Sequence, residues 1–156
     1  MQAFLPILIA VALLASGIAA GVLLWSVMGG VPLLLSLPAE RYVEIHQFWG
    51  NRFDGLQPLL VSVTVVLGVL LAIFAPAQPA GALFAVSAVA ALAVIIISRF
   101  RNVPLKRKVM RLDAHNLPAD WERLDPRRAW AAWNLARTVC GILAFAVNVA
   151  AVSLLI

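Results

Sequence analysis

Three long stretches of the chain contain no charged side chain, and this pattern restricts the possible folds more than any other feature. Residues 1–39, 55–98 and 138–156 contain no Asp, Glu, Lys or Arg. A helix needs roughly 20 apolar residues to cross the hydrocarbon core of a bilayer. A chain of 156 residues that is 63% hydrophobic and 12% charged has too little interior to bury so much apolar surface. We therefore expect the surplus apolar surface to face lipid.

The uncharged stretches predict an all-α fold, a four-helix transmembrane bundle, with residues 1–156 forming a single integral membrane domain. The expected spans are about 3–37, 59–74, 80–98 and 138–156. The turn Ala75-Pro76-Ala77-Gln78-Pro79 separates the second span from the third. The first span is longer than a bilayer requires, so we expect a bend near its end, at Gly29, Gly30 and Pro32.

A short amphipathic interfacial helix is expected after the first span, in the connection over about 38–58. Tyr42, Ile45 and Trp49 form an apolar stripe at helical spacing. Polar residues recur at helical spacing on another side, namely Glu40, Glu44, Gln47 and Asn51. The simplest interpretation is a helix that lies at the membrane surface with its polar side in water.

The second connection, over about 99–137, contains most of the basic residues, and six of them fall between Arg99 and Arg111. With four spans, both connections lie on one side of the membrane. The positive-inside rule makes this side cytoplasmic and places both termini outside. We therefore expect a multi-pass protein of the cell inner (plasma) membrane with cytoplasmic basic loops. Basic residues beside a span favour membrane lipids as partners, and no nucleic-acid partner is predicted.

The last helix, expected to begin at Asp125-Pro126, contains the most informative polar residues. At 100° per residue one stripe contains Trp130, Asn134, Arg137, Gly141, Ala144 and Asn148. A charge inside the bilayer costs free energy, and Arg137 stands where the apolar run begins. Two interpretations stay open. One is a site for an anion or carbonyl group at the membrane edge, and the other is an interfacial anchor with Trp130 and Trp133 in an aromatic belt.

The interfacial helix supplies further candidates. His46 can serve as an acid or base near neutral pH. Glu44, Gln47 and Asn51 are candidate substrate-binding residues, although Glu44 and His46 point to different faces of a helix. No metal site is predicted, because the two histidines and one cysteine have no partner at helical metal-ligand spacing. No cofactor-binding motif is recognised either.

Three stretches carry a likeness to a known family of membrane proteins. They are Leu37 to Gln47, residues 102–105 with 117–121, and Trp130-Ala131-Ala132-Trp133-Asn134-Leu135-Ala136-Arg137. They resemble the anthrone oxygenase-like family, a group of small four-span membrane proteins. The last stretch is the most specific, with Trp, Asn and Arg at matching spacing. Many relatives look like Asn-x-Pro-x-Asn in the middle stretch, where this chain has Lys106 in place of the second Asn.

The resemblance implies oxidation of an anthrone to an anthraquinone with neither metal nor flavin, and thus a lipophilic aromatic substrate and no cofactor. For such a reaction we expect Arg137 and Asn134 to stabilise an oxyanion, such as a phenolate or enolate. His46 is then the candidate base for the proton that is lost first. The alternative is a protein without enzymatic activity that binds a lipid or a partner helix at the Asn134/Arg137 stripe.

A weaker likeness concerns Arg41, His46 and Asn51, which precede Pro58. This pattern is similar to that of the membrane-associated glutathione transferases, which also have four spans. The resemblance would imply a glutathione thiolate as ligand, but the expected cluster of arginines and asparagines is incomplete here. Small residues in the first span are also compatible with a homo-oligomer.

Overall fold

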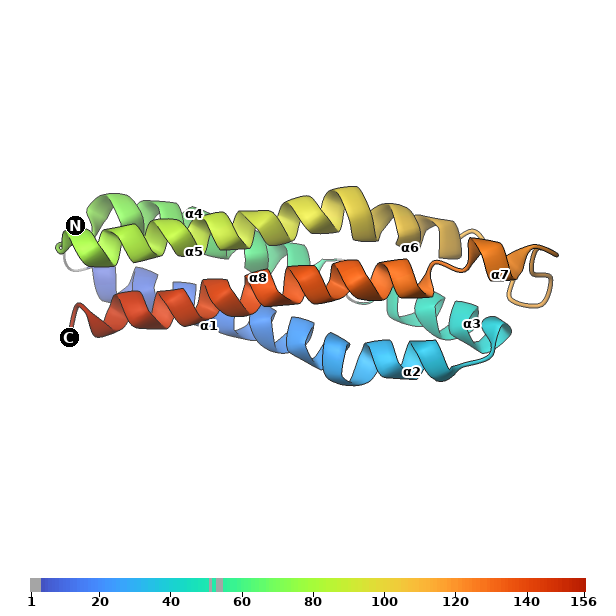
Figure 1. Ribbon diagram of the computed structural model, residues 1–156. Coiled ribbons are helices and arrows are strands. Elements are labelled where there is room, and N and C mark those ends of the chain that lie inside the picture. Colours follow the sequence, from blue (N-terminus) through green and yellow to red (C-terminus); the bar gives the residue numbers. More distant parts are fainter. Residues whose placement is uncertain (1–3, 51, 53–54) are drawn as a thin grey trace.

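The computed structural model describes residues 4–50, 52 and 55–156, and all regular secondary structure within these ranges is helical. Four helices in the described ranges are long and apolar enough to cross a membrane: Leu5–Ser36, Leu56–Phe74, Gln78–Val109 and Trp121–Ser153. They pack side by side, and α1 begins at the same end of the molecule at which α8 ends (Figure 1). The predicted all-α fold with four spans is confirmed, and the chain is a multi-pass membrane protein.

The first span contains a π-helical segment. Helix α1 (Leu5–Trp25) continues through η2 (Ser26–Gly30) into α2 (Val31–Ser36), and the N–H of Val31 bonds the carbonyl of Ser26, five residues earlier. A π-helical segment inserts one residue into the helix and is a known cause of a kink. Figure 1 shows that the helix changes direction between α1 and α2. The predicted bend therefore coincides with this segment.

The third span extends further than its apolar run. Helix α5 (Gln78–Ile97) is followed without a break by η3 (Ser98–Asn102) and α6 (Val103–Val109). The sequence interpretation placed the basic connection from residue 99 onward, whereas the structure keeps the chain helical to Val109. The physical reason is that Lys and Arg form helices well, and Pro104 is tolerated in the first turn of α6. Loss of hydrophobicity therefore does not mark the end of the helix.

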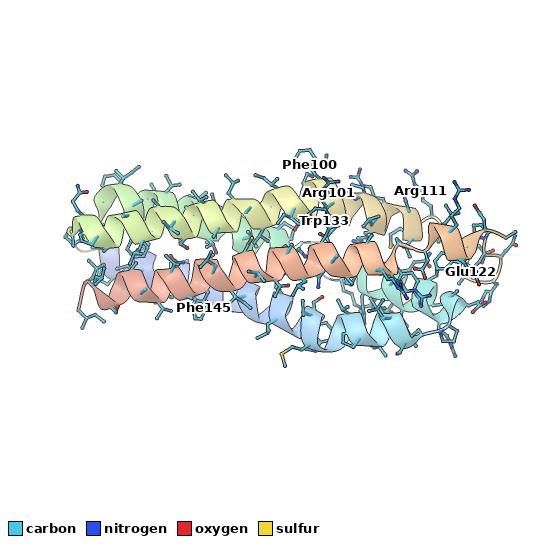
Figure 2. All side chains as sticks on the ribbon, in the orientation of Figure 1. Phe100, Arg101, Arg111, Glu122, Trp133 and Phe145 are labelled. Carbon is cyan, nitrogen blue, oxygen red and sulfur yellow. The ribbon has the colours of Figure 1, made fainter. Side chains whose placement is uncertain are left out.

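The second span is the shortest of the four, and this shapes one end of the molecule. Helix α4 (Leu56–Phe74) begins where the other three spans still continue. At that level α3 (Ala39–Gly50) packs against α2 and α6, around a core that includes Leu34 and Val109. We call this end the basic end because the Lys and Arg of α6 and its neighbours lie there. Figure 2 shows Arg111 and Glu122 at this end and Phe145 toward the other.

The last helix begins close to the predicted position, Asp125-Pro126. After the short helix α7 (Trp121–Leu124), α8 runs over Arg127–Ser153. The N-cap residue is Pro126, one residue after the expected Asp125, and the carboxylate of Asp125 accepts the backbone N–H of Arg127 at 2.9 Å. The buried face of α8 consists of Asn134, Thr138, Gly141, Ala144, Asn148 and Ala151. The stripe derived from the sequence therefore lies on the interior side of the helix, with Trp130 and Arg137 half-buried beside it.

The close contact between α4 and α5 requires a residue without a side chain at Gly68. A Cβ at this position would lie 3.0 Å from the Cβ of Ala88 and 3.2 Å from the carbonyl oxygen of Phe84. We expect Gly68→Leu to destabilise the protein by about 1–3 kcal/mol, because overpacking forces the two helices apart. Thermal unfolding in detergent measures the effect. Gly21→Leu is the matched control, since a Cβ at Gly21 meets no atom within 4 Å, and an equal loss in both variants would contradict the prediction.

Candidate functional site

A cavity of about 320 Å³ lies at the basic end, between α3, the start of α4 and the three longer spans. This volume is at the lower end of the range of about 300–1,000 Å³ that is usual for small-molecule sites. Its apolar wall consists of Val22, Leu23, Leu34, Pro58, Val61, Val94, Ile95 and Val103, with Trp25, Trp49 and Trp130. Its polar wall consists of Ser26, His46, Gln57, Ser62, Ser98, Arg99, Asn102, Lys106 and Arg137.

The helices create this cavity by two local features. Because α4 begins only at Leu56, no fourth span fills the space beside α1 and α5 at the basic end. Two π-helical segments, Ser26–Gly30 and Ser98–Asn102, also lie along the cavity and contribute their first residues to its wall. Such segments redirect the side chains that follow them and are frequent at functional sites. The first residue of each segment is a serine that accepts a hydrogen bond from α8: Ser26 accepts one from Asn134, and Ser98 accepts one from Arg137.

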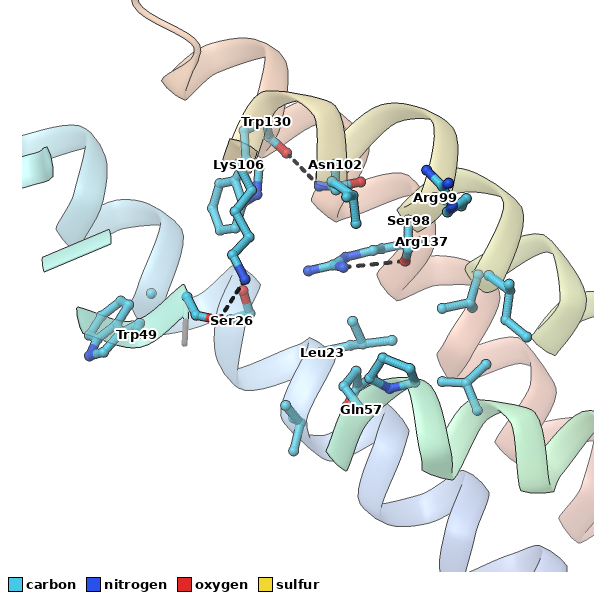
Figure 3. A pocket seen from close by; sticks show the side chains of 18 of the residues that line it. Leu23, Ser26, Trp49, Gln57, Ser98, Arg99, Asn102, Lys106, Trp130 and Arg137 are labelled. Carbon is cyan, nitrogen blue, oxygen red and sulfur yellow. Dashed lines mark hydrogen bonds between the residues drawn. The ribbon is translucent and has the colours of Figure 1, made fainter. Parts of the chain in front are cut away.

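The guanidinium of Arg137 is held in one orientation. Its Nε and Nη2 donate to Oδ1 of Asn134 at 2.9 and 2.7 Å, and its Nη1 donates to Oγ of Ser98 at 3.3 Å. Asn134 is fully buried, and its Nδ2 donates to Oγ of Ser26 at 3.0 Å. A guanidinium has five N–H groups, so two of them have no partner among the residues that the structure describes. Figure 3 shows Arg137 reaching into the hollow between η3 and α1.

The cavity carries positive charge. Arg99, Lys106 and Arg137 line it, and its described lining contains neither Asp nor Glu. Within the described ranges no carboxylate lies at ion-pair distance from Arg137. Lys106 Nζ donates to the carbonyl of Gly50 at 2.5 Å, which connects α6 to the end of α3 (Figure 3). An anion, or an oxygen that becomes negative during a reaction, would find fixed donors here.

His46 is the titratable group of α3 that faces the cavity, and it is only 5% exposed. Its ring centroid lies 5.3 Å from that of Tyr42 and 5.5 Å from that of Trp130. Burial lowers the pKa of His46 to about 4, and the positive charge of Lys106 acts in the same direction. The imidazole is therefore neutral at physiological pH and can accept a proton.

The predicted site residues separate into two groups. His46, Trp130 and Arg137 line the cavity, and Asn134 lies directly behind Arg137. Trp133 does not line the cavity. Its ring is covered by the guanidinium of Arg101, 4.7 Å from the ring centroid (Figure 2). Helix α8 therefore brings three of its four predicted site residues together with the base candidate of α3.

The other polar candidates of α3 have different surroundings. Glu44 pairs with Arg41 at 2.8 Å and has the ring nitrogen of His115 at 3.9 Å. Gln47 Nε2 donates to the carbonyls of Val109 and Leu112 at 3.1 and 2.9 Å, which holds α3 against the end of α6. Asn51 lies outside the described residues. The polar side of α3 is thus divided, with Glu40 exposed and His46 and Gln47 directed into the protein.

Several lining residues were not predicted from the sequence. Ser26 and Ser98 are polar residues in apolar spans, and this contrast was the available signal for them. Gln57 and Asn102 each have a buried amide oxygen that receives no hydrogen bond from any described residue. The Nε2 group of Gln57 donates to the carbonyl of Ala19 at 3.3 Å, and the Nδ2 group of Asn102 donates to the carbonyl of Trp130 at 3.4 Å. Buried oxygens without a partner are uncommon, so both are available to donors of a ligand.

Comparison with known proteins identifies the chain's relatives. The family model for anthrone oxygenase matches residues 49–147, which is more than half of the 156-residue chain. The match includes Asn134 and Arg137, as well as the lining residues of α4, η3 and α6, whereas His46 precedes it. No curated protein and no solved structure matches the chain. The extent of the family match shows that this chain belongs to the anthrone oxygenase family.

Proposed function

We propose that this protein oxidises a flat, lipophilic anthrone or related phenolic compound with dioxygen, using neither metal nor flavin. One observation carries the proposal: Arg137 presents two N–H groups that no described residue accepts, in a cavity that also contains a neutral, buried His46. The first can stabilise an oxyanion and the second can accept a proton. The apolar wall with its three tryptophans is suited to a flat aromatic ring system.

The first step is the removal of a proton from carbon. The methylene carbon of an anthrone is acidic because loss of its proton gives an aromatic enolate with the negative charge on oxygen. In our proposal His46 takes this proton, and the N–H groups of Arg137 bond the enolate oxygen. Asn134 acts through Arg137 as a positioning residue, since it holds Nε and Nη2 with one amide oxygen. The unpartnered amide oxygens of Gln57 and Asn102 are suited to accept phenolic O–H groups.

The second step consumes dioxygen. The enolate carbon gives electrons to dioxygen and forms a C–O bond, and the peroxide takes the proton from the His46 imidazolium. His46 then removes the second proton of the same carbon, the O–O bond breaks and a ketone forms. The leaving hydroxide takes this proton from the His46 imidazolium and becomes water. The balance is one methylene plus one dioxygen to one ketone plus one water. One oxygen atom of dioxygen remains in the product.

We propose the plasma membrane as the location, with the basic end in the cytoplasm and membrane lipids around the spans. Exposed basic residues gather at this end, among them Arg101, Arg107, Lys108 and Arg111. The opposite connection between α4 and α5, residues 75–77, contains no Lys or Arg. This asymmetry favours the basic end as the cytoplasmic one.

Isotope labelling tests the proposed reaction. The protein in native-lipid discs is incubated with anthrone under ¹⁸O₂, and mass spectrometry follows the product while an electrode follows dioxygen. We expect one labelled oxygen per anthraquinone, equal amounts of dioxygen consumed and quinone formed, and no effect of a metal chelator. Absence of turnover above protein-free discs would contradict the proposal. A co-purifying lipid that disappears in Arg137→Ala would then support the alternative of a lipid-binding protein.

A further inference from the structure

A second, smaller cavity lies deeper among the spans. Its volume is about 10 Å³, the space of about one water-sized molecule. All four spans line it, with Ser16, Ala19, Leu23, Val61, Thr64, Ala91, Val94, Gly141 and Ala144. Leu23, Val61 and Val94 also line the large cavity, so these three side chains form its floor and separate the two spaces.

The floor depends on a glycine of α8. A Cβ at Gly141 would lie 2.7 Å from Cδ1 of Leu23, so the leucine occupies the space that a larger residue would need. Leu23 is 1% exposed and belongs to the same core cluster as Val61 and Val94. Gly141 therefore allows Leu23 to lie back against α8, between the small cavity and the large one.

The lining of the small cavity is apolar except for two hydroxyl groups, those of Ser16 and Thr64. The hydroxyl of Ser16 donates to the carbonyl of Ala12 at 2.7 Å, and that of Thr64 donates to the carbonyl of Leu60 at 2.9 Å. Nδ2 of Asn148 donates to the Ser16 oxygen at 3.3 Å. A buried water needs two to four polar partners. The two hydroxyl groups of the lining already donate within their own helices. The amide oxygen of Asn148 has no partner among the described residues, but Asn148 does not line the space. The space is thus suited to a small apolar molecule.

We propose that dioxygen binds in this small cavity, which we call the dioxygen station, before it reaches the substrate. This inference rests on the proposed function. Dioxygen is neutral and apolar, so it dissolves better in hydrocarbon than in water and concentrates among the spans. From the small cavity it passes the floor formed by Leu23, Val61 and Val94 and meets the enolate. Arg137 and His46 contact the substrate from the polar wall, so dioxygen does not compete with them for space.

Two matched pairs of variants test this station. Ala91 and Ala90 are buried neighbours on α5, and only Ala91 lines the small cavity. Ala19 and Ala20 form the same kind of pair on α1. We expect Ala91→Val and Ala19→Val to raise the KM for dioxygen about three- to tenfold, because the added methyl groups fill the space. Ala90→Val and Ala20→Val should leave this KM unchanged.

The measurement is the initial rate of anthrone oxidation at varied dioxygen pressure, with anthrone saturating. The KM for anthrone should not change in Ala91→Val or Ala19→Val, because neither residue lines the large cavity. An equal KM for dioxygen within both pairs, with wild-type turnover intact, would overturn the dioxygen station and leave the proposed function standing. If one pair does not fold, the other decides. No dioxygen uptake by the wild type would overturn the proposed function, and the station with it.

Discussion

Arg137→Ala is expected to lower kcat/KM for anthrone oxidation by about 100- to 1,000-fold, the usual loss when one oxyanion donor is removed. Two guanidinium N–H groups face the cavity, and alanine leaves the enolate oxygen without them. Arg137→Lys should restore only part of the rate. Lysine keeps the charge but cannot bond Asn134 through two nitrogens at once, so its ammonium is less fixed in direction.

The design of this experiment has to separate catalysis from stability. Removal of Arg137 also leaves Oδ1 of fully buried Asn134 without its guanidinium partner, which costs stability. Rates are therefore compared at a temperature at which all variants remain folded by circular dichroism. Arg101→Ala is the matched control, because Arg101 lies on the same side of the molecule but does not line the cavity. A folded Arg137→Ala variant with the wild-type kcat/KM would exclude the oxyanion role.

The spans and the interior face of α8 could be predicted from the sequence because both depend on local pattern. Charge-free stretches of sufficient length mark the spans whatever surrounds them. The 100° periodicity placed Asn134, Gly141, Ala144 and Asn148 on one face, and the structure buries all four. The extension of the third span to Val109 was missed because hydropathy reports the membrane and not the helix. Arg99 to Val109 contain good helix formers that end the apolar run without ending the helix.

The partners of the polar residues could not be predicted because they depend on how distant segments pack. Asn134 bonds Ser26, 108 residues earlier in the chain, and Arg137 bonds Ser98, 39 residues earlier. No periodicity within one helix contains this information. The burial of His46 has a similar origin. Helix α4 begins late, so α3 packs against α6 and turns His46 toward the cavity, whereas its pattern alone fitted a helix on the membrane surface.

His46→Ala is expected to lower kcat by about 100- to 10,000-fold, the range for loss of a general base. The pH profile gives the test that a purely structural role would not meet. The pKa of His46 is about 4, and only the neutral imidazole accepts a proton, so kcat/KM should rise with pH through about 4 and then level off. His115→Ala is the matched control, because His115 is exposed and lies outside the cavity.

The same pKa predicts how the stability of the folded protein depends on pH. The unfolded chain has an ordinary histidine pKa of 6.5, so between pH 6.5 and 4 it binds more protons than the folded protein. Stability should fall as the pH falls through this window, and His46→Phe should remove part of that slope.

Burial is the larger cause of the low pKa of His46, and the charge of Lys106 is the smaller cause. Lys106→Gln should therefore move the acid limb of kcat/KM to higher pH but keep it below 6.5. A limb that stays in place would show that Lys106 does not act on His46, and a limb absent from the wild type would exclude His46 as the base.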